Sequence, residues 1–577
     1  MRTSDMITVF CSWSGTATDG PWSEQVLTML KPLAAQNLIA LWEGGPPATE
    51  TAAAQERAQA LARSALFLVL LSPDYLAAPE RVAELEQVWR RHAGGELVLI
   101  PVVLRACAWR ESAVGDLTPL PVDGQALASR DDPEEGLRQV ERGLRCALGS
   151  LLFARLRQRD ASAAELLRFC SCLAPAPIPE SLLTEGLARP SHPLAALAAD
   201  HSALMVTLAA LEADGLLTRD PQSGNLQVHE LVREALTEHL PAEELTAWQP
   251  LAIEALVTAY PGQQPEHWPL YEALLPHALH CAAWIAREPA LQTAPAASLL
   301  EQAGTYLRQH GRYQEAVPLF ERALSIREQV LGPEHAETAT SLYDLAFVYR
   351  FAGRSSEALP LLERALSIRE QALGPAHPLT VTTLESLAFL HMSTGRLTTA
   401  FPLLERLAPL AEQVFGPSNP KTLSALNTLA LCYERLDRLP EACTLFERAL
   451  ALCEQAHQSP PSLMATLLHN LALLYRRLGH TTESLALLER ALAVCEQTFG
   501  PSDRRAATTL YNLALLYRDL GRREEALPLL ERALGRREEA LPLLERALAI
   551  YERAAGSNHP LTRQVRETYR QFQPAED

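Results

Sequence analysis

The sequence predicts a protein of several domains: a parallel α/β domain, a helical middle segment and a C-terminal α-solenoid. Its 577 residues are several times the length of a typical domain, so more than one hydrophobic core is expected. Strand-like apolar runs alternate with helical stretches over residues 1–150. From about residue 297 onward, a self-similar pattern recurs every 42 residues. We therefore expect domains at 1–150, 151–245 and 297–577, with a helical linker at 246–296.

The first domain shows the alternation of strands and helices that builds a parallel sheet. Strands are expected at 7–13, 38–42, 65–72 and 96–104, with a weak fifth near 125–128, and helices at about 21–36, 51–63, 79–92 and 132–147. The strands are apolar on both faces, which is typical of a sheet covered by helices. Helical crossovers predict a doubly wound sheet, and ligands bind such sheets beyond the carboxyl ends of the strands.

Four segments of this domain resemble the TIR domain family. They are FCSWSGTATDGPW at 10–22, LIALWEGG at 38–45, LFLVLLSPDYLAAPERVAELEQVW at 66–89 and ELVLIPVVLRACAW at 96–109. Together they span the domain, and the resemblance implies a flavodoxin-like fold that associates with other TIR domains. Some TIR domains also cleave NAD⁺ at the nicotinamide–ribose bond, with a glutamate on the helix after the third strand.

By this resemblance, the catalytic residue is Glu84, in the VAELEQ stretch of that helix. Cleavage builds positive charge on the ribose, which a fixed carboxylate stabilises, as in glycoside hydrolysis. Glu80 lies one turn earlier and Glu86 points elsewhere, so both are weaker candidates. The implied substrate is NAD⁺, and no cofactor is expected. Four residues near strand ends are expected to line the pocket: Ser12, Trp13, Asp19 and Glu43.

The middle segment, residues 151–245, combines compact helices with two short strands, GLLTRD and LQVHE, around the turn PQSGN. Three helices followed by a strand pair predict a winged helix. APIPESLL at 176–183 and VHELVREAL at 228–236 resemble the winged-helix module that follows the nucleotide-binding domain of STAND-type ATPases. His229 matches that family's nucleotide-sensing histidine, but the nucleotide-binding domain itself is missing before the module. His229 is therefore expected to be structural.

Composition argues against several classes of function. Neither Lys31 nor Lys421 follows a glycine, so the chain has no phosphate-binding Gly-Lys-Ser/Thr loop. The net charge of −18 opposes nucleic-acid binding, as does the expected third helix, HSALMVTLAALEADG, which has two acids and no Arg or Lys. The ten cysteines form no CxxC pair, which indicates buried thiols and no metal site. Without a long apolar run or a signal peptide, we expect a cytoplasmic protein with no membrane partner.

The C-terminal region is built from six units in one register. The turn between the two helices of each unit falls at Gly311, Gly353, Gly395, Asp437, Gly479 and Gly521. Small residues stand seven positions before each turn, such as Ala346, and five positions after it, such as Ala358. They let two antiparallel helices approach, while a large residue nine positions after the turn, such as Phe320, fills the groove between them. This pattern resembles the tetratricopeptide repeat, in the longer form of kinesin light chains.

Stacked units form a concave groove lined by their first helices, which is expected to bind a protein or peptide. Polar and aromatic residues near the middle of those helices are the candidates for partner contact: Tyr343, Asn427, His469, Asn470, Tyr511 and Asn512. An asparagine amide can hydrogen-bond an extended backbone without reading its sequence. The alternative is that these residues form ordinary solvated faces.

The end of the array carries an exact duplication, since GRREEALPLLERAL at 521–534 recurs at 535–548. Fourteen residues return to within about 40° of the starting face, so the copy can extend the last helix almost in phase. The alternative is a recent duplication without function. A polar capping helix is expected at 559–572.

Together these domains favour a signalling or defence protein, and the use of arginine in place of lysine is typical of a GC-rich bacterial genome. In this hypothesis the repeat groove captures a partner, and the TIR-type domains cluster and cleave NAD⁺ to nicotinamide and ADP-ribose. The alternative is a non-catalytic scaffold, which the loop WEGGPPATET favours because it lacks the family's Pro-Gly-x-x-Trp continuation. A transcriptional regulator acting through the winged helix is disfavoured by the acidic third helix.

Overall fold

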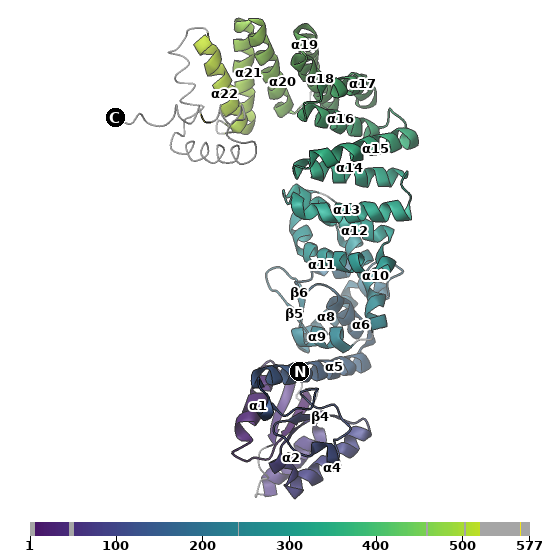
Figure 1. The fold of residues 1–577 in the computed structure, drawn as a ribbon, viewed down its shortest axis with the longest axis vertical. Helices are drawn as coiled ribbons and strands as arrows, with labels where there is room; N and C mark the ends of the chain where they lie inside the picture. Colours follow the sequence, from purple (N-terminus) through teal and green to yellow (C-terminus); the bar gives the residue numbers. More distant parts are fainter. Residues whose placement is uncertain are drawn as a thin grey trace, which may run out of the picture. The chain divides into compact units, whose positions relative to one another are not determined.

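The computed structural model describes residues 6–44, 51–239, 242–262, 264–456, 460–500, 503–519 and 566. The chain divides into two compact units, Met1–Val330 and Leu331–Asp577. The first unit holds the α/β domain, the middle segment and the first two helices of the repeat array (Figure 1). The second unit holds the helices of the array that follow.

A four-stranded parallel sheet forms the centre of the N-terminal domain. Its strands are β1 (Ile7–Ser12), β2 (Ile39–Gly44), β3 (Leu66–Leu71) and β4 (Val98–Val103), in the order β2-β1-β3-β4. The crossovers contain helices α1 (Gly20–Ala35), α2 (Thr51–Arg63), the short α3 (Pro73–Leu76) and α4 (Pro79–Ala93). Every residue of β3 is buried, because strands flank it on both sides and helices cover the sheet. The predicted parallel α/β fold with these four strands is confirmed.

The predicted fifth strand near 125–128 is wrong. Leu127–Ser129 forms a 3₁₀ turn, η2, and β4 instead makes an isolated bridge from Val102 to Leu120. Leu120 exchanges two backbone hydrogen bonds with β4, of 2.7 and 3.0 Å. The backbone near 125–128 closes on itself instead, since the amide of Ser129 donates to the carbonyl of Ala126 at 3.0 Å, so this segment adds no strand to the sheet.

Helix α5 (Pro133–Arg159) runs without a break from the N-terminal domain into the middle segment (Figure 1). The carboxylate of Asp132 caps its first turn by accepting hydrogen bonds from the amides of Glu134 and Glu135. A helix of this length extends over about 40 Å. The predicted domain boundary at residue 150 therefore falls inside one continuous helix.

Two glycines bring α5 against a different neighbour in each of its halves. A Cβ on Gly143 would lie 2.5 Å from the side chain of Leu120, in the N-terminal domain. A Cβ on Gly149 would lie 2.5 Å from the Cβ of Ala235, on α9 (Glu230–His239). At Gly149 the backbone carbonyl of Leu231 would also lie 2.6 Å from the added carbon, so only glycine fits there, whereas the Leu120 side chain facing Gly143 can move aside. The two domains therefore share one rigid helix.

The middle segment contains the elements expected from its sequence, in the expected order. The helices are α6 (Ala161–Cys172), η3 (Leu182–Gly186), α7 (Ala195–Ala199), α8 (His201–Ala213) and α9, with β5 (Leu217–Arg219) and β6 (Leu226–Val228) before α9. β5 and β6 pair antiparallel across a turn in which Gly224 has a φ of 71°. The winged-helix assignment stays a prediction. Helices α10 (Ala242–Ala259) and α11 (Trp268–Arg287) occupy the predicted linker.

The repeat array consists of antiparallel helix pairs, as predicted. Its helices are α12 (Ala294–Gln309), α13 (Tyr313–Val330), α14 (Ala336–Phe351), α15 (Ser355–Leu373), α16 (Pro378–Ser393), α17 (Leu397–Phe415), α18 (Pro420–Arg435), α19 (Leu439–Gln455), α20 (Pro461–Leu478), α21 (Thr481–Phe499) and α22 (Arg504–Asp519). Five of the six predicted turns lie in the described residues, at the predicted positions and with left-handed backbone, for example a φ of 83° at Gly353 and 59° at Asp437, while the turn at Gly521 lies outside them. Small-to-large packing is visible in the first pair, where a Cβ on Gly304 would lie 2.8 Å from the ring of Phe320.

A hydrogen-bonded joint connects successive units of the array. After Gly374 ends one helix with a φ of 86°, the His377 side chain accepts from the amide of Leu379 and caps the next helix. The hydroxyl of Thr380 then donates to the Gly374 carbonyl at 2.9 Å. The same pattern, Gly-Pro-x-(His/Asn)-x-x-Thr, recurs at 332–338 and 416–422.

Some expectations fall outside the described residues, namely the duplication at 521–548 and the capping helix at 559–572. Within the described part of the chain, no helix combines the length and the apolar character that crossing a membrane requires.

The replacement Gly149→Val should lower the free energy of unfolding by about 1 to 3 kcal/mol, because the added carbons would overlap α9. Chemical denaturation of the full chain measures this change. Gly262→Val is the control, since no atom lies within 4 Å of a Cβ there. Equal stabilities of the two variants would contradict the close packing of α5.

Burial of His277 should make the protein sensitive to mild acid. Its ring Nε2 donates to Pro177 O at 3.1 Å, and burial lowers the pKa of His277 to about 4. In the unfolded chain His277 is protonated below about pH 6.5, whereas in the folded chain it stays neutral down to about pH 4. The free energy of unfolding is therefore highest above pH 6.5 and decreases as the pH drops toward 4. Between pH 7 and 4.5, His277→Gln should lose about 2 kcal/mol less unfolding free energy than the native chain. The exposed His201→Gln serves as the control, and an unchanged pH slope in His277→Gln would contradict the assignment.

Candidate functional site

The carboxyl ends of the parallel strands gather polar side chains at one edge of the sheet. Ser12 ends β1, Gly44 ends β2, Ser72 follows β3 and Arg105 comes two residues after β4. Two separate hydrogen-bonded clusters form there. One is centred on Glu84 and the other on Asp19, and both were singled out from the sequence.

The Glu84 cluster joins α4 to the end of β1. Ser12 Oγ donates to Glu84 Oε2 at 3.2 Å and lies 3.2 Å from the hydroxyl of Tyr75. Ser12 and Tyr75 are fully buried, whereas the Glu84 side chain keeps 10% of its surface exposed. Burial raises the pKa of the Tyr75 hydroxyl, which therefore remains protonated. The structure thus brings together two of the predicted site residues, Ser12 and Glu84.

Two arginines hold the Glu84 carboxylate. Arg57, on α2, donates from Nη2 to both carboxylate oxygens at 2.9 and 2.7 Å, and from Nε at 3.2 Å. Arg81, one turn before Glu84 on α4, lies 3.3 Å from Oε2 and also donates to Gly44 O at 3.5 Å. Their side chains are only 15% and 2% exposed. Glu84 is therefore a paired, largely buried carboxylate rather than a solvated one.

An aromatic stack lies beside this ion pair. Phe10 pairs with Trp42 and with Phe67 across neighbouring strands, and its ring centroid lies 4.4 Å from that of Trp42 and 5.1 Å from that of Phe67. The guanidinium carbon of Arg57 lies 5.2 Å from the Phe10 ring and 5.4 Å from the Trp42 ring. Arg57 therefore bonds to a carboxylate and lies beside the stacked rings of Phe10 and Trp42.

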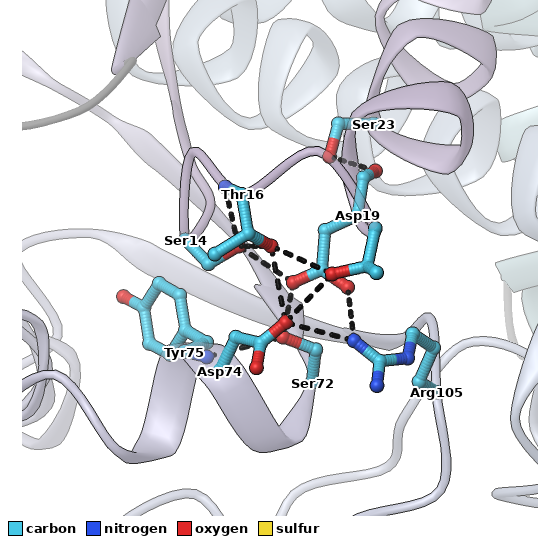
Figure 2. Close-up of polar contacts among 9 residues, drawn as sticks. Ser14, Thr16, Asp19, Ser23, Ser72, Asp74, Tyr75 and Arg105 are labelled. Atoms are coloured by element: carbon cyan, nitrogen blue, oxygen red, sulfur yellow. Dashed lines mark hydrogen bonds and ion pairs between the residues drawn. The ribbon is translucent and has the colours of Figure 1, made fainter.

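The Asp19 cluster ties the loop after β1 to the turn after β3 (Figure 2). Asp19 is completely buried and accepts hydrogen bonds from Ser14 at 2.6 Å, from Ser72 and from Arg105 at 3.2 Å. Arg105 also donates to Asp74 at 2.8 Å. Hydrogen bonds from the hydroxyls of Thr18 and Thr16, followed by that from Arg105, lower the pKa of Asp74. Three side chains of the domain thus hold the Asp19 carboxylate in place, and its predicted role in lining a pocket stays a prediction.

The remaining predicted residues of the domain lie apart from these clusters. Trp13 is half-buried, and Glu43 is exposed near the end of β2. The loop 45–50, between Gly44 and α2, is outside the described residues. Among the residues that the structure does describe, no group of three or more His, Cys, Asp and Glu side chains is arranged to hold a metal ion.

His229 serves as a contact between domains. Its Nδ1 accepts from the amide of Leu231 at 3.2 Å, and its Nε2 lies 3.1 Å from the side-chain oxygen of Gln36, after α1. Burial, followed by the charge of Arg145, lowers the pKa of His229. The predicted structural role agrees with these contacts, which fasten the middle segment to the N-terminal domain.

In the array, most predicted partner-binding residues bond to the equivalent helix of the next unit. Asn470 donates to Asn427 at 2.9 Å, Asn512 lies 3.2 Å from His469 Nε2, and Tyr343 lies 3.1 Å from Ser386. These five residues of the predicted set are at least partly buried, and the Tyr511 side chain is outside the described atoms. The contacts stabilise the stacking of units, a role that the sequence analysis did not assign to them.

A pocket of about 390 Å³ opens among α14, α16 and α18. Its lining mixes apolar, polar and charged side chains: Arg350, Glu385, Phe389, Met392, Asn427 and Arg435. Phe389 is 48% exposed, and the Arg350 guanidinium lies 5.2 Å from its ring. Burial raises the pKa of Glu385, which accepts a hydrogen bond from Ser424. Asn427 is thus the one predicted partner-binding residue that lines this pocket.

Comparison with protein families agrees with this architecture. A model of the TIR domain matches residues 9–140, and a model of the tetratricopeptide repeat matches 295–371, 379–455 and 463–539. The chain contains a TIR domain and an array of tetratricopeptide repeats. A second tetratricopeptide model matches 532–561, and a domain of unknown function, DUF7779, matches 154–245. TIR and tetratricopeptide modules in one chain are those of a signalling or interaction protein.

Individual relatives cover parts of the chain. The uncharacterized protein y4lF of Sinorhizobium fredii is 30% identical over 120 residues, which are 20% of this chain and 35% of the relative, so the chain spans about a third of that relative's length. The solved TPR-like repeats assigned to a kinesin light chain of Podosopora anserina are 28% identical, with a TM-score of 0.32, over 35% of this chain and 96% of theirs. BtubC (BKLC) from P. vanneervenii is 18% identical, with a TM-score of 0.35, over 41% of this chain and 92% of its own.

The sequence analysis missed the arginines of the TIR domain. Arg81 precedes Glu84 by three residues, so helical spacing alone would have placed the two side chains together. Arg57 lies on a different helix, 27 residues from Glu84, and no spacing rule connects them. Arg105 has a visible signal, because it comes two residues after the apolar β4 and so lies at the carboxyl edge of the sheet.

Proposed function

We propose that the chain is a signalling protein whose tetratricopeptide groove binds a partner and whose TIR domain then associates with other copies and hydrolyses NAD⁺. The observation that carries the enzymatic part is the position of Glu84. It lies at the carboxyl edge of the sheet, where ligands of parallel sheets bind, and it is hydrogen-bonded to Ser12 at the end of β1. Association of TIR domains would enclose this edge, so that bulk solvent screens the Glu84 charge less while single water molecules still enter.

Cleavage of the nicotinamide–ribose bond requires little from the protein beyond a fixed negative charge near the ribose. As the bond from ribose C1′ to the pyridinium nitrogen breaks, its electron pair passes to nicotinamide, which leaves as a neutral molecule. Positive charge grows on C1′, where the Glu84 carboxylate would stabilise it. Water then adds its oxygen to C1′ and releases a proton, so the products are nicotinamide, ADP-ribose and a proton.

The partner site is supported by the pocket among α14, α16 and α18. Phe389 and Met392 offer apolar contact, while Asn427 offers an amide that can meet a peptide backbone. An extended peptide needs this combination, because its backbone must be hydrogen-bonded while some of its side chains are buried. We therefore favour a peptide segment of another protein as the occupant.

A non-catalytic scaffold is the second candidate, and the pairing of Glu84 favours it. Two guanidinium groups lie within 3.3 Å of one carboxylate, so the negative charge needed by the ribose is already neutralised in this state. In the scaffold reading, the same residues simply hold α2, α4 and β1 together.

Nicotinamide release should depend on Glu84. We expect the full chain, incubated with NAD⁺ at high protein concentration, to release nicotinamide at a measurable rate, and Glu84→Gln to slow it at least about 100-fold, because the fixed charge is lost. Glu86→Gln, on the exposed face of the same helix, should keep the native rate. Native activity in Glu84→Gln would refute the catalytic assignment. If the native chain releases no nicotinamide even when its TIR domains are shown to be clustered, the enzymatic function is excluded and the non-catalytic scaffold is the remaining candidate.

Peptide capture should depend on the pocket of the array. Peptides selected on the full chain from a displayed random library should bind Phe389→Ala at least about tenfold more weakly, because this exposed ring is a central apolar contact. Val330→Ala, another exposed apolar residue, is the control. If selected peptides bind Phe389→Ala as well as the native chain, the groove has been assigned to the wrong surface.

A further inference from the structure

The position of Arg57 raises a question that hydrolysis alone does not answer. A cation from α2 fills the space between the Glu84 carboxylate and the rings of Trp42 and Phe10. The guanidinium is flat, carries one positive charge, stacks near aromatic rings and bonds to a carboxylate. The nicotinamide ring of NAD⁺ is also flat and carries one positive charge. The surroundings of Arg57 therefore suit either group.

We propose that Arg57 occupies the subsite of a planar cationic ring, the nicotinamide of NAD⁺, and closes it in the unliganded protein. This inference rests on the proposed function, whose substrate supplies the ring. In the open state Arg57 swings out, and the pyridinium stacks on Trp42 with its positive charge beside Glu84. Arg57 is thus a regulatory residue that competes with the substrate through the same contacts.

Arg57 and Arg81 differ in how easily each can move away from the Glu84 carboxylate. Arg81 shares helix α4 with Glu84, is 2% exposed and also donates to the carbonyl of Gly44, so it is fixed on both sides. Arg57 reaches the carboxylate from α2 and keeps 15% of its side chain exposed. Withdrawal of Arg57 therefore needs only a change of rotamer or a small movement of α2.

The exchange also conserves charge. Removing Arg57 alone would take one positive charge from a largely buried carboxylate, which is costly. When a pyridinium enters as Arg57 leaves, the count of charges around Glu84 is unchanged. When the bond to C1′ then breaks, nicotinamide becomes neutral and the positive charge moves to the ribose, still beside Glu84. Return of Arg57 after product release closes the subsite again.

The test is the binding of 1-methylnicotinamide, a pyridinium cation that cannot be hydrolysed at a ribose bond, measured by isothermal titration calorimetry on the full chain. Arg57→Ala should bind it about tenfold more tightly than the native chain, because the competing cation is gone. Arg63→Ala, an exposed arginine of the same helix, should bind like the native chain. Neutral nicotinamide should bind Arg57→Ala about tenfold more weakly than the methylated cation. The double variant Arg57→Ala/Trp42→Leu should bind 1-methylnicotinamide no more tightly than the native chain.

Equal affinity of the native chain and Arg57→Ala would overturn the inference, as would a gain that survives Trp42→Leu. Thermal unfolding checks that each variant is folded. If Arg57→Ala is unfolded, Arg57→Gln, which keeps most of the side-chain volume, replaces it in the binding experiment. The outcomes separate this inference from hydrolysis. If Arg57→Ala binds 1-methylnicotinamide more tightly but releases no nicotinamide from NAD⁺, the result supports the cation subsite and excludes the hydrolase activity. If Arg57→Ala releases nicotinamide from NAD⁺ but binds 1-methylnicotinamide no more tightly than the native chain, the result supports the hydrolase activity and excludes the cation subsite.

Discussion

A parallel sheet delivers the carboxyl ends of all its strands to one edge, and the chemistry of this TIR domain depends on that constraint. Ser12, Gly44 and Arg105 come from three different strands or their ends, yet they lie together at this edge. Charges collected there must be paired because the surrounding strands are buried. The pairing divides them into two clusters, of which one ties the loop after β1 to the turn after β3 and the other joins Glu84 to the end of β1.

The features that follow from local patterns could be read from the sequence. Strands apolar on both faces indicated the parallel sheet, and the 42-residue period placed the turns of the array at residues such as Gly353. The predicted strand at 125–128 is wrong because this segment forms a local 3₁₀ turn, in which the amide of Ser129 donates to the carbonyl of Ala126. The boundary expected at residue 150 lies inside α5, which continues through Gly149 because the close contact with α9 needs a residue without a side chain there.

The site was predictable only in part, for a related reason. Ser12 and Glu84 lie at positions that topology brings together, and the sequence assigned both. Arg57 comes from a separate helix, so its contact with Glu84 depends on packing between α2 and α4 that no periodicity encodes. In the array, Asn427 and Asn470 were recognised as unusual, but their contact across units became visible only with the helices stacked. Polar contacts therefore join successive units of the array, and in the TIR domain two arginines of the same domain bind the Glu84 carboxylate.

The central claim is that the edge around Glu84 is a dinucleotide site kept closed by Arg57. A structure of the full chain bound to a non-hydrolysable NAD⁺ analogue with a carbocyclic ribose tests it most directly. If Arg57 closes this site, the nicotinamide ring will stack on Trp42 beside Glu84, and Arg57 will be displaced from the carboxylate. An analogue bound elsewhere, with the Arg57–Glu84 pair intact, would contradict it.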